Sequence, residues 1–525
     1  MSTTAAPLPA SPTAAAETRR DSTRSLVLIG VLTITAAGAA LRFSTLGLQS
    51  YHHDEVITVM RVLRGDFGQM LEAVKSSESN PPLYYVLAWF WAKLFGTGEV
   101  GLRSLSALFG AATVPVGYLI GRQLAGWRTG LVLSAMLAAN PMLIWYSQEA
   151  RSYAPLVFFG ALSLLFFVRA LDSRAGRDLG LWALFSALAL LSHYFAFFVV
   201  GIEGLWLLLA LRDRWRAVLP ALAAVAAVGL ALLPLLFAQV NPNHIGWIEN
   251  SPLGERFWET AVSFTIGETG HVIAEPPRER YAIVPLLLLG AGALLVAFFG
   301  NRRERRGAGL ALVLGIGVAG LAWLAALIGK DYVVERNLLP ALIPLAAVAA
   351  IGFAGRRTYR LGVLLAVALC AYWVTFDIHV TQTPNLQRPN FRVLTQELGS
   401  PAHRRAVVSW KLAGDSIRWY LHDGALRMYG GEAPIREVDV LSKPGSAGDR
   451  ANLPRSFRPV QTIRLDRLTL TRFVSPKTMR LRFATIDGIP TGFGANAVVI
   501  DAPPSLLPTL GSEARTTPTG PEEEG

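Results

Sequence analysis

The chain has 525 residues, of which 52% are hydrophobic and only 16% charged, and it carries a formal net charge of +12. With a mean hydropathy of +0.39 it is too apolar for an ordinary soluble protein of this length. Its arginines lie in short clusters between apolar runs and form no single basic face, which argues against a nucleic-acid partner. The single cysteine, Cys370, lies inside an apolar run, which excludes an intramolecular disulfide and a cysteine-based metal cage.

The two ends of the chain have the composition of tails. Residues 1–23 are rich in Ala, Thr, Ser and Pro, and we expect a disordered cytoplasmic tail there. The run 25–40 follows basic residues and ends in small ones, which is also the pattern of a cleaved signal peptide. We interpret it as a retained first span, because the loop that follows works best when it is tethered to the membrane. Residues 503–525, rich in Pro and Glu, are predicted to be a second disordered tail.

Apolar runs of span length recur through the first three-quarters of the chain. Crossing a membrane as a helix takes about 20 apolar residues. Runs that approach this length lie at 24–43, 103–122, 129–147, 153–171, 179–193, 195–211, 217–238, 281–300, 308–328, 337–354 and 361–377. The fifth run is short, and its boundary with the sixth is the least well defined. The sequence therefore predicts about eleven transmembrane helices within residues 24–377.

The arginine clusters predict the orientation of these spans. If the N-terminus is cytoplasmic, every cluster falls on the cytoplasmic side, as the positive-inside rule requires. The clusters are Arg122 and Arg128; Arg174 and Arg177; Arg212, Arg214 and Arg216; Arg302, Arg303, Arg305 and Arg306; and Arg356, Arg357 and Arg360. We therefore expect a multi-pass protein of the plasma (inner) membrane with a cytoplasmic N-terminus.

The side on which the arginine clusters fall also decides the placement of an ambiguous apolar segment, residues 82–95. It has about three-quarters of the length that a span needs, and counting it as a span would move every later cluster to the wrong side. We therefore place it in the first outer loop, residues 44–102, as a short interfacial or re-entrant helix. Residues 61–76 have one apolar helical face and are predicted to form an amphipathic helix that lies flat on the membrane.

The outer face then gathers several loops and a domain. It holds the first loop, turns at 146–153, 193–194 and 330–336, a long loop at 239–280, and everything after about residue 378. Residues 378–502 contain strand-like runs at 405–410 and 497–500 and a helix-like run at 415–421. This part is predicted to be a small extracytoplasmic α/β domain.

Asp54 and Glu55 lie about ten residues beyond the end of the first span. Consecutive side chains point in different directions in a helix or an extended chain, so these two carboxylates are expected to have separate roles. Taken alone, they fit a solvated acidic pair at a membrane surface better than a functional site.

Other polar groups are expected at the same level. Glu78 and Asn80 precede paired prolines, Glu149 and Arg151 lie in a turn that ends at Tyr153, and His193 and Tyr194 interrupt an apolar stretch. Each alone is an ordinary helix-end or interfacial group. Their coincidence on one face predicts a site that takes one substrate from the lipid and another from water.

Residues 51 to about 166 resemble the GT-C glycosyltransferases that use lipid-phosphate sugars, in particular the bacterial relatives of protein O-mannosyltransferases and of the aminoarabinose transferase. The matching elements are His53-Asp54-Glu55, Asn80-Pro81-Pro82-Leu83-Tyr84-Tyr85, Arg103, Gly121-Arg122 with Gly126, Asn140-Pro141 and Ser147-Gln148-Glu149-Ala150-Arg151-Ser152-Tyr153. Further on, Glu335-Arg336-Asn337-Leu338-Leu339-Pro340 is similar to that group's Arg-Tyr-Leu-Pro segment, with Asn337 in place of the tyrosine. The C-terminal domain matches only in position.

The resemblance implies a GT-C fold and the transfer of a sugar from a polyprenyl-phosphate donor to an extracytoplasmic acceptor, with inversion at the anomeric carbon. Asp54 then corresponds to the catalytic carboxylate that takes the proton of the acceptor hydroxyl. Arg151, Lys330 and Arg336 are the candidates to stabilise the leaving phosphate. The other expected substrate-binding residues are His53, Glu55, Glu78, Asn80, Glu149, Tyr153, His193 and Tyr194.

Several points stay open at this stage. Relatives differ in metal use and the first loop has no Asp-x-Asp pair, so no cofactor is certain and a divalent metal is left open. Asn241, His244 and Trp247 in the long loop are expected to cover the site, together with the outer domain. Mannose is the expected donor sugar by analogy, with arabinose, aminoarabinose and galacturonic acid as alternatives, and the acceptor is a glycan, a glycolipid or a protein. The alternatives are a transporter or flippase of lipid-linked sugars, or a non-catalytic membrane receptor.

Overall fold

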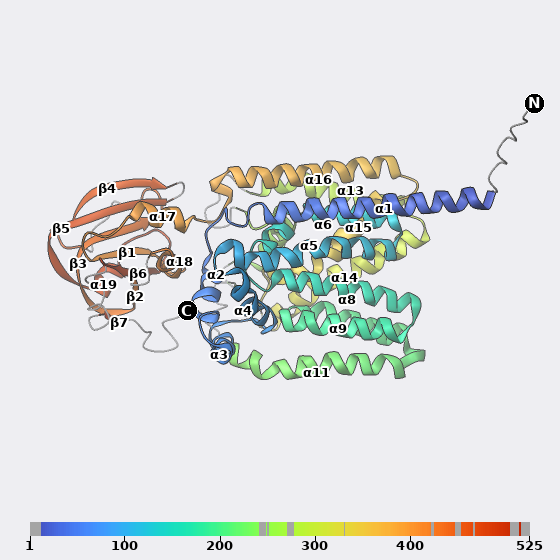
Figure 1. Ribbon diagram of the computed structural model, residues 1–525, viewed down its shortest axis with the longest axis horizontal. Helices are drawn as coiled ribbons and strands as arrows, with labels where there is room; N and C mark the ends of the chain where they lie inside the picture. The colour runs from blue at the N-terminus through green and yellow to red at the C-terminus, as the bar shows by residue number, and fades with distance from the viewer. Residues whose placement is uncertain are drawn as a thin grey trace, which may run out of the picture.

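The computed structural model describes residues 12–240, 248, 251–269, 278–329, 331–421, 425–446, 453–465, 468–503 and 514–515. In these residues a bundle of long helices meets, end to end, a smaller domain built on a β-sheet (Figure 1). We call the end of the bundle beside the sheet the domain end and the opposite end the arginine end. The arrangement confirms the predicted helical membrane protein with a small C-terminal α/β domain.

Helices occupy all eleven positions predicted as spans. They are α1 (Pro12–Phe43), α5 (Glu99–Leu124), α6 (Trp127–Ala139) followed by α7 (Pro141–Ser147), α8 (Tyr153–Ser173), α9 (Gly176–Ser192), α10 (Ala196–Ala210), α11 (Trp215–Gln239), α13 (Glu279–Phe299), α14 (Arg302–Leu327), η5 (Glu335–Ala341) with α15 (Leu342–Phe353), and α16 (Tyr359–Gln382). Among the described residues, eight helices are long and apolar enough to cross a membrane, and the bent pair α6–α7 makes a ninth. The helices α9 and α10, of 17 and 15 residues, are shorter.

Two boundaries differ from those expected from the sequence. Helix α1 begins at Pro12, so the second half of the expected tail is helical, in keeping with its alanine-rich composition. Helix α16 continues to Gln382, beyond residue 377, where the membrane part was expected to end. Residues 1–11 and most of the expected C-terminal tail lie outside the described residues.

The outside of the bundle is apolar. Phe237, Leu287 and Phe298 are 74%, 69% and 69% exposed, a surface that is costly in water and natural in lipid. Inside, small residues let helices approach closely. A Cβ added to Gly352 would lie 1.8 Å from the carbonyl oxygen of Gly292, so α13 and α15 touch backbone to backbone at that point.

All five arginine clusters lie at the arginine end. An Arg303 guanidinium N–H donates to the carbonyl of Gln123, and the backbone N–H of Arg356 donates to Glu304, which joins three of the connections. Arg174 pairs with Asp213, which follows α10 in the short helix η2 (Arg212–Arg214) and joins two more. The alternation of helices that the sequence predicts is therefore present.

The third predicted span is broken. Residues 129–147 form two helices, α6 and α7, which meet at an angle of 57°. Asn140 and Pro141 cause the break, because proline cannot donate to the preceding turn and the Asn140 side chain caps the backbone N–H of Leu143 instead. Asn140 also donates to the carbonyl of Phe264 in α12 (Leu253–Ile266), which ties the bend to the long loop.

The first loop folds into short helices at the domain end: α2 (His53–Ile57), η1 (Thr58–Val62), α3 (Phe67–Ser77) and α4 (Leu83–Phe95). Helix α4 forms as predicted for residues 82–95. The single amphipathic helix predicted over residues 61–76 is wrong in its first half, because Asp66 caps a new helix there by accepting from the backbone N–H of Gln69. Met70 and Val74 form the buried face of α3, as expected.

The sheet domain has seven strands among its described residues: β1 (Arg405–Trp410), β2 (Leu426–Met428), β3 (Gly430–Ser442), β4 (Arg458–Leu465), β5 (Leu468–Arg482), β6 (Asn496–Asp501) and β7 (Ala514–Arg515). Six follow the order β2-β6-β1-β3-β5-β4, with β1 and β3 parallel and the other neighbours antiparallel, and β7 pairs with β3. The helices of the domain are α17 (Phe391–Leu398), α18 (Ala413–Tyr420) and α19 (Phe483–Asp487). Both predicted strands and the predicted helix are present.

Helices α17 and α18 attach this domain to the first loop. The Tyr420 hydroxyl donates to Glu99 Oε1 over 2.6 Å and accepts from the backbone N–H of Tyr51 over 2.7 Å. Arg392 of α17 also donates to Glu99. The domain therefore contacts the same loop that carries Asp54 and Glu55.

Candidate active site

Glu55 is held by protein groups on every side. Its side chain is fully buried, and Arg103 donates to both carboxylate oxygens over 2.7 Å. The backbone N–H groups of Ala150 and His52 donate to the same two oxygens over 2.9 and 3.0 Å. Burial alone would raise the pKa of Glu55, but Arg103 lowers it below its ordinary value. The geometry therefore gives Glu55 a structural role in place of the expected contact with substrate.

Arg103 completes this anchor from helix α5. Its remaining hydrogens go to backbone carbonyls of the first loop, those of Leu46, Gln49 and Ser50. A buried arginine that satisfies a carboxylate and three carbonyls fixes the path of the loop, because each of these groups would otherwise be buried without a partner. The sequence singled out Arg103 only as an element of the family resemblance.

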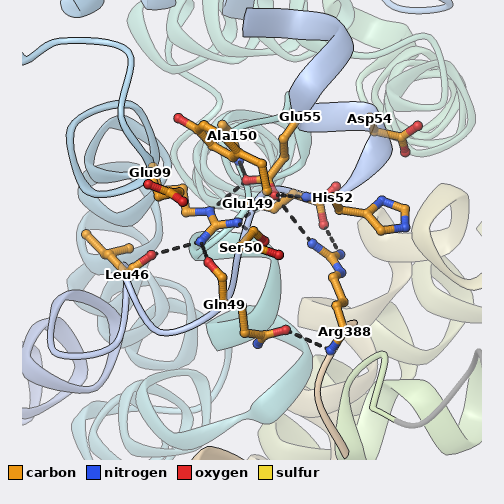
Figure 2. Close-up of polar contacts among 12 residues, drawn as sticks. Leu46, Gln49, Ser50, His52, Asp54, Glu55, Glu99, Glu149, Ala150 and Arg388 are labelled. Atoms are coloured by element: carbon orange, nitrogen blue, oxygen red, sulfur yellow. Dashed lines mark hydrogen bonds and ion pairs between the residues drawn. The ribbon is translucent and has the colours of Figure 1, made fainter. Parts of the chain in front are cut away.

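Arg388 is a site residue that the sequence did not indicate. It follows the short helix η6 (Pro384–Leu386), where a lone arginine after the last span gives no signal. Its NH2 donates to Glu149 over 2.5 Å, its NH1 lies 3.7 Å from Glu55, and its guanidinium lies 4.8 Å from the ring centre of Trp145. Figure 2 shows Arg388, Glu149 and Glu55 pointing toward one another. We call Glu55, Arg103, Glu149 and Arg388 the loop cluster.

Asp54 points to the other side of α2. In Figure 2 its carboxylate faces away from Glu55 and Glu149, as expected for consecutive residues with separate roles. The Asp54 residue is partly exposed. Burial would raise the pKa of Asp54, but the positive charges of Arg151 and Arg336 hold it well below its usual range. Asp54 is therefore an accessible, ionised carboxylate flanked by two arginines.

Arg151 joins Asp54 to Glu78. Its NH1 donates to Glu78 Oε2 over 2.6 Å and lies 3.4 Å from the backbone carbonyl of Asp54. The Tyr85 hydroxyl donates to the same Glu78 oxygen over 2.6 Å, and Thr58 lies 3.5 Å from the other oxygen. Arg151 Nε is buried and has no hydrogen-bond partner among the described residues. The structure thus brings the expected Glu78 and Arg151 together. It also leaves Arg151 Nε as a donor without a partner among the described residues.

Asn80 and Tyr194 meet through Gln239 at the end of α11. Gln239 donates to the carbonyl of Asn80 over 3.1 Å and accepts from the Tyr194 hydroxyl over 2.7 Å. The side-chain oxygen of Asn80 is buried without a partner among the described residues. Tyr194 therefore supports the loop that carries Asn80, and Asn80 itself keeps a free acceptor.

Tyr153 and His193 pack together beside the arginines. Their ring centres lie 5.5 Å apart, and Tyr146 lies 4.6 Å from Tyr153 on its other side. His193 Nδ1 accepts from the backbone N–H of Phe195, which assigns the proton to Nε2. Burial, helped by Arg151 and Arg336, lowers the pKa of His193 to about 3. His193 is therefore a neutral donor and cannot bind a phosphate as a cation.

His53 faces the sheet domain. Its Nδ1 is buried without a partner among the described residues. Burial lowers the pKa of His53 against the pull of Asp54 and of Asp415 in α18, while Arg427 at β2 lowers it further. His53, which was expected to bind substrate, thus lies at the border between the first loop and the sheet domain.

A second acidic group lies near Arg336, and its member Glu268 was not indicated by the sequence. Glu268, which follows α12, accepts from the Tyr146 hydroxyl over 2.6 Å and shares a hydrogen bond with Glu335 at the start of η5. Burial and the charge of Glu335 raise the pKa of Glu268 well above its ordinary value. The two carboxyl groups are therefore hydrogen-bonded to each other near Arg336.

Some of the expected site lies outside the described residues, namely Lys330, Asn241, His244 and Trp247. Within the described part of the chain, no group of three or more His, Cys, Asp or Glu side chains is placed to hold a metal ion. Whether the site binds a divalent metal is therefore still an open question.

Comparison with known sequences finds similarity to a family over part of the chain. The model of the dolichyl-phosphate-mannose-protein mannosyltransferase family matches residues 79–237. This range includes Asn80, Glu149, Arg151 and Tyr153 and begins just after Glu78. An uncharacterized protein of Aquifex aeolicus is 28% identical over 190 residues. That match covers 35% of this chain and spans 37% of the relative's length.

Comparison with solved structures extends to most of the chain. ArnT from Cupriavidus metallidurans, bound to undecaprenyl phosphate, aligns over 84% of this chain and 97% of its own, with a TM-score of 0.51 and 11% identity. The Archaeoglobus fulgidus oligosaccharyltransferase aligns over 72% of this chain and 58% of its own (TM-score 0.47, 13% identity). The S. cerevisiae protein O-mannosyltransferase Pmt1-Pmt2 complex aligns over 48% of this chain and 37% of its own (TM-score 0.34, 20% identity). The family match and the fold shared with ArnT confirm the resemblance to the GT-C glycosyltransferases of the protein-mannosyltransferase and ArnT type.

Proposed function

We propose that this protein is a membrane glycosyltransferase that moves a sugar, with inversion, from a polyprenyl-phosphate donor to an acceptor at the domain end of the bundle. The observation that carries this proposal is the accessible, ionised Asp54 between Arg151 and Arg336, beside an anchor that fixes its loop. The family matched over residues 79–237 and the undecaprenyl phosphate bound by ArnT support a lipid-phosphate donor. We take mannose as the donor sugar, from the description of that family.

In the proposed reaction Asp54 is the general base. The acceptor oxygen forms a bond to the anomeric carbon, the bond from that carbon to the phosphate oxygen breaks, and the hydroxyl proton moves to the Asp54 carboxylate. The lipid phosphate leaves with the electron pair of the broken bond. Arg151 and Arg336, supported by Glu78 and Tyr153, stabilise the charge that develops on it.

The two arginines also link donor binding to the strength of the base. In the free protein they lower the pKa of Asp54, which makes it a weak base. When a lipid phosphate neutralises them, the pKa of Asp54 rises toward the pH at which the enzyme works. We therefore propose that the donor binds before the acceptor is deprotonated.

The proposed orientation follows the positive-inside rule. The arginine end would face the cytoplasm, and the domain end, with Asp54 and the sheet domain, would face the other side of the plasma membrane. Reaction on that side suits an acceptor of the cell envelope. Accessibility of a cysteine introduced in the sheet domain to a membrane-impermeant thiol reagent tests this orientation.

Transfer by the purified protein, with a polyprenyl-phosphate mannose as donor and a cell-envelope lipid and protein fraction as acceptor, tests the function. Asp54→Asn should lower transfer by about 10²–10⁴-fold without changing the unfolding temperature, because only the base is lost. Glu72→Gln, at a carboxylate exposed on α3, is the matched control and should behave like the wild type. Near-normal turnover of Asp54→Asn would reject Asp54 as the base, and movement of intact donor across vesicles without a product would favour the transporter alternative.

A further inference from the structure

Arg256 on α12 is a nearly buried cation, 6% exposed, that the proposed reaction does not use. Its NH1 donates to Asp331 Oδ1 over 2.7 Å and its NH2 to Asp331 Oδ2 over 2.6 Å. NH1 also donates to the carbonyl of Val333 over 3.0 Å, and Nε donates to the carbonyl of Ser251 over 3.1 Å. Two parallel bonds from a planar guanidinium fix the direction of a carboxylate as well as its distance. Arg256 therefore sets the path of residues 331–333.

This path leads directly to Arg336 at the start of η5. Asp331 Oδ1 also accepts from the backbone N–H of Val333 over 3.1 Å. Asn337, the residue in place of the family's tyrosine, donates from its side chain to the carbonyl of Tyr332 over 2.8 Å. Arg336 thus lies inside a segment that is tied at both ends, so its backbone follows the ion pair.

Helix α12 is itself fixed against the other side of the site. Phe264 accepts from the Asn140 side chain over 2.9 Å at the break between α6 and α7. Glu268, just after the end of α12, accepts from the Tyr146 hydroxyl of α7 over 2.6 Å. Helix α7 leads into the turn that carries Arg151. Because α12 packs against both α7 and η5, it joins the two segments that carry the site arginines.

The ion pair is better placed to orient a segment than to stabilise the fold. The Arg256 and Asp331 side chains are 7% and 15% exposed, whereas those of Arg103 and Glu55 are 2% and 0% exposed. Breaking a partly exposed pair costs less stability than breaking a fully buried one, because water can solvate the partner that is left. The fork at Asp331 is therefore better explained by the residue that follows it in the chain, Arg336.

We propose that Arg256 and Asp331 are positioning residues, which hold Arg336 where one lipid phosphate can contact it and the other site arginine at once. Neither residue of the pair touches the substrate in this role. The proposal rests on the proposed function, in which the two arginines stabilise the leaving phosphate. Loss of the pair leaves Arg336 charged but displaced, so that the phosphate and Asp54 each lose one of their two cations.

Arg256→Gln removes the charge and the fork. It should lower kcat/KM for transfer by about 10–100-fold, the effect of displacing a reacting group by about 1 Å. It should also move the acid limb of the kcat/KM profile to higher pH. The charge of Arg336 lowers the pKa of Asp54 in the free protein, so a displaced Arg336 lets that pKa rise. The other groups that lower it lie outside this segment and stay in place, namely Arg151, His52 and His53.

Conservative and neighbouring variants separate positioning from loss of stability. Arg256→Lys keeps the charge without the fork and should show smaller changes of the same sign. Val262→Ala, at a buried position of α12 in the apolar cluster with Ile266 and Phe376, should lower the unfolding temperature and leave the acid limb at its wild-type pH. Glu255→Gln, at an exposed carboxylate of the same helix, should match the wild type.

Two measurements do not depend on turnover. Binding of undecaprenyl phosphate to the full chain in lipid nanodiscs should weaken about tenfold in Arg256→Gln, the effect of losing one charge-assisted hydrogen bond. Hydrogen exchange in residues 331–337 should become faster. Wild-type phosphate affinity together with an unmoved acid limb would overturn the proposal, and so would unaltered exchange in residues 331–337. If the variant binds undecaprenyl phosphate less tightly than the wild type and neither transfers a sugar, the proposed function fails while the role of the pair in holding Arg336 is confirmed.

Discussion

Two buried clusters of charge in this protein have similar components and different surroundings. The loop cluster joins Glu55 and Glu149 to Arg103 and Arg388. In the sheet domain, Arg405, Glu437, Asp439, Arg472 and Asp501 form what we call the sheet cluster. Arg405 and Arg472 both donate to the carbonyl of Leu398, so the sheet cluster fastens the end of α17.

The difference lies in what adjoins each cluster. The sheet cluster is covered by its own strands and by α17. The loop cluster lies next to Asp54, Arg151 and Asn80. There the ionised Asp54 carboxylate is accessible, and Arg151 Nε and Asn80 Oδ1 are buried without partners among the described residues. A network of ion pairs that is covered on all sides therefore indicates a contact that stabilises the fold. Buried polar atoms without partners beside such a network indicate where a ligand is expected to bind.

The sharpest test of this distinction is Arg103→Met. It leaves the fully buried Glu55 without the cation that donates to both of its oxygens, which should cost about 3–5 kcal/mol of stability. The unfolding temperature of the purified protein should fall steeply, whereas that of Asp54→Asn should not. If both variants unfold at the wild-type temperature, the loop cluster does not stabilise the fold.

Arg388→Gln should have a smaller effect on stability, about 1.5–3 kcal/mol, because it removes one charged hydrogen bond from Glu149. It should also lower the rate of transfer, since the turn that carries Glu149 and Arg151 loses its ion pair with Arg388. Arg388→Lys keeps the charge without the planar fork and should recover part of both losses. A wild-type transfer rate in Arg388→Gln would show that the cluster holds the fold and does not position the reacting groups.

Tyr420→Phe tests the contact between the domain and the first loop. It removes a hydroxyl that donates to Glu99 and accepts from Tyr51, at a cost of about 1–1.5 kcal/mol. Hydrogen exchange in residues 50–57 should become faster, with the sheet itself unchanged. Unaltered exchange in that segment would mean that α18 does not support the loop.

The smallest expected effect concerns pH and the sheet cluster. Burial and Asp439 raise the pKa of Glu437 to about 7. Because the folded state then holds the proton more tightly than the unfolded chain, this contribution is complete below the ordinary pKa and is lost as the pH rises through about 7. Between pH 5 and 8 the wild type should lose about 1 kcal/mol more stability than Glu437→Gln, allowing for solvent screening. Parallel thermal unfolding profiles of the two proteins across this range would contradict the assignment.

Most of the bundle could be predicted from the sequence because a membrane imposes length and charge rules on every span. The short helices were harder. Asn140 and Pro141 break a run that looks continuous by hydropathy, and Asp66 begins a new helix inside an apparently single amphipathic pattern. In both cases a local hydrogen bond from a capping side chain outweighs the average polarity of the segment.

The site was predictable where its residues form motifs and not where they meet through the fold. Asp54, Glu78 and Arg151 were indicated by position and come together. Glu55 was expected at the substrate and is instead bound by Arg103, because only the three-dimensional structure shows which charges a carboxylate can reach. Arg388 and Glu268 come from distant segments that carry no pattern of their own.

The distance of Arg388 along the chain has a consequence for the order of assembly. It lies 239 residues after Glu149 and 339 after Gln49, so the ribosome makes the acidic loops long before it makes their last cation. A nascent chain that already contains every predicted span but ends before Arg388 lacks the cation that pairs with Glu149. The loop cluster can therefore be completed only when synthesis has passed the final membrane helix.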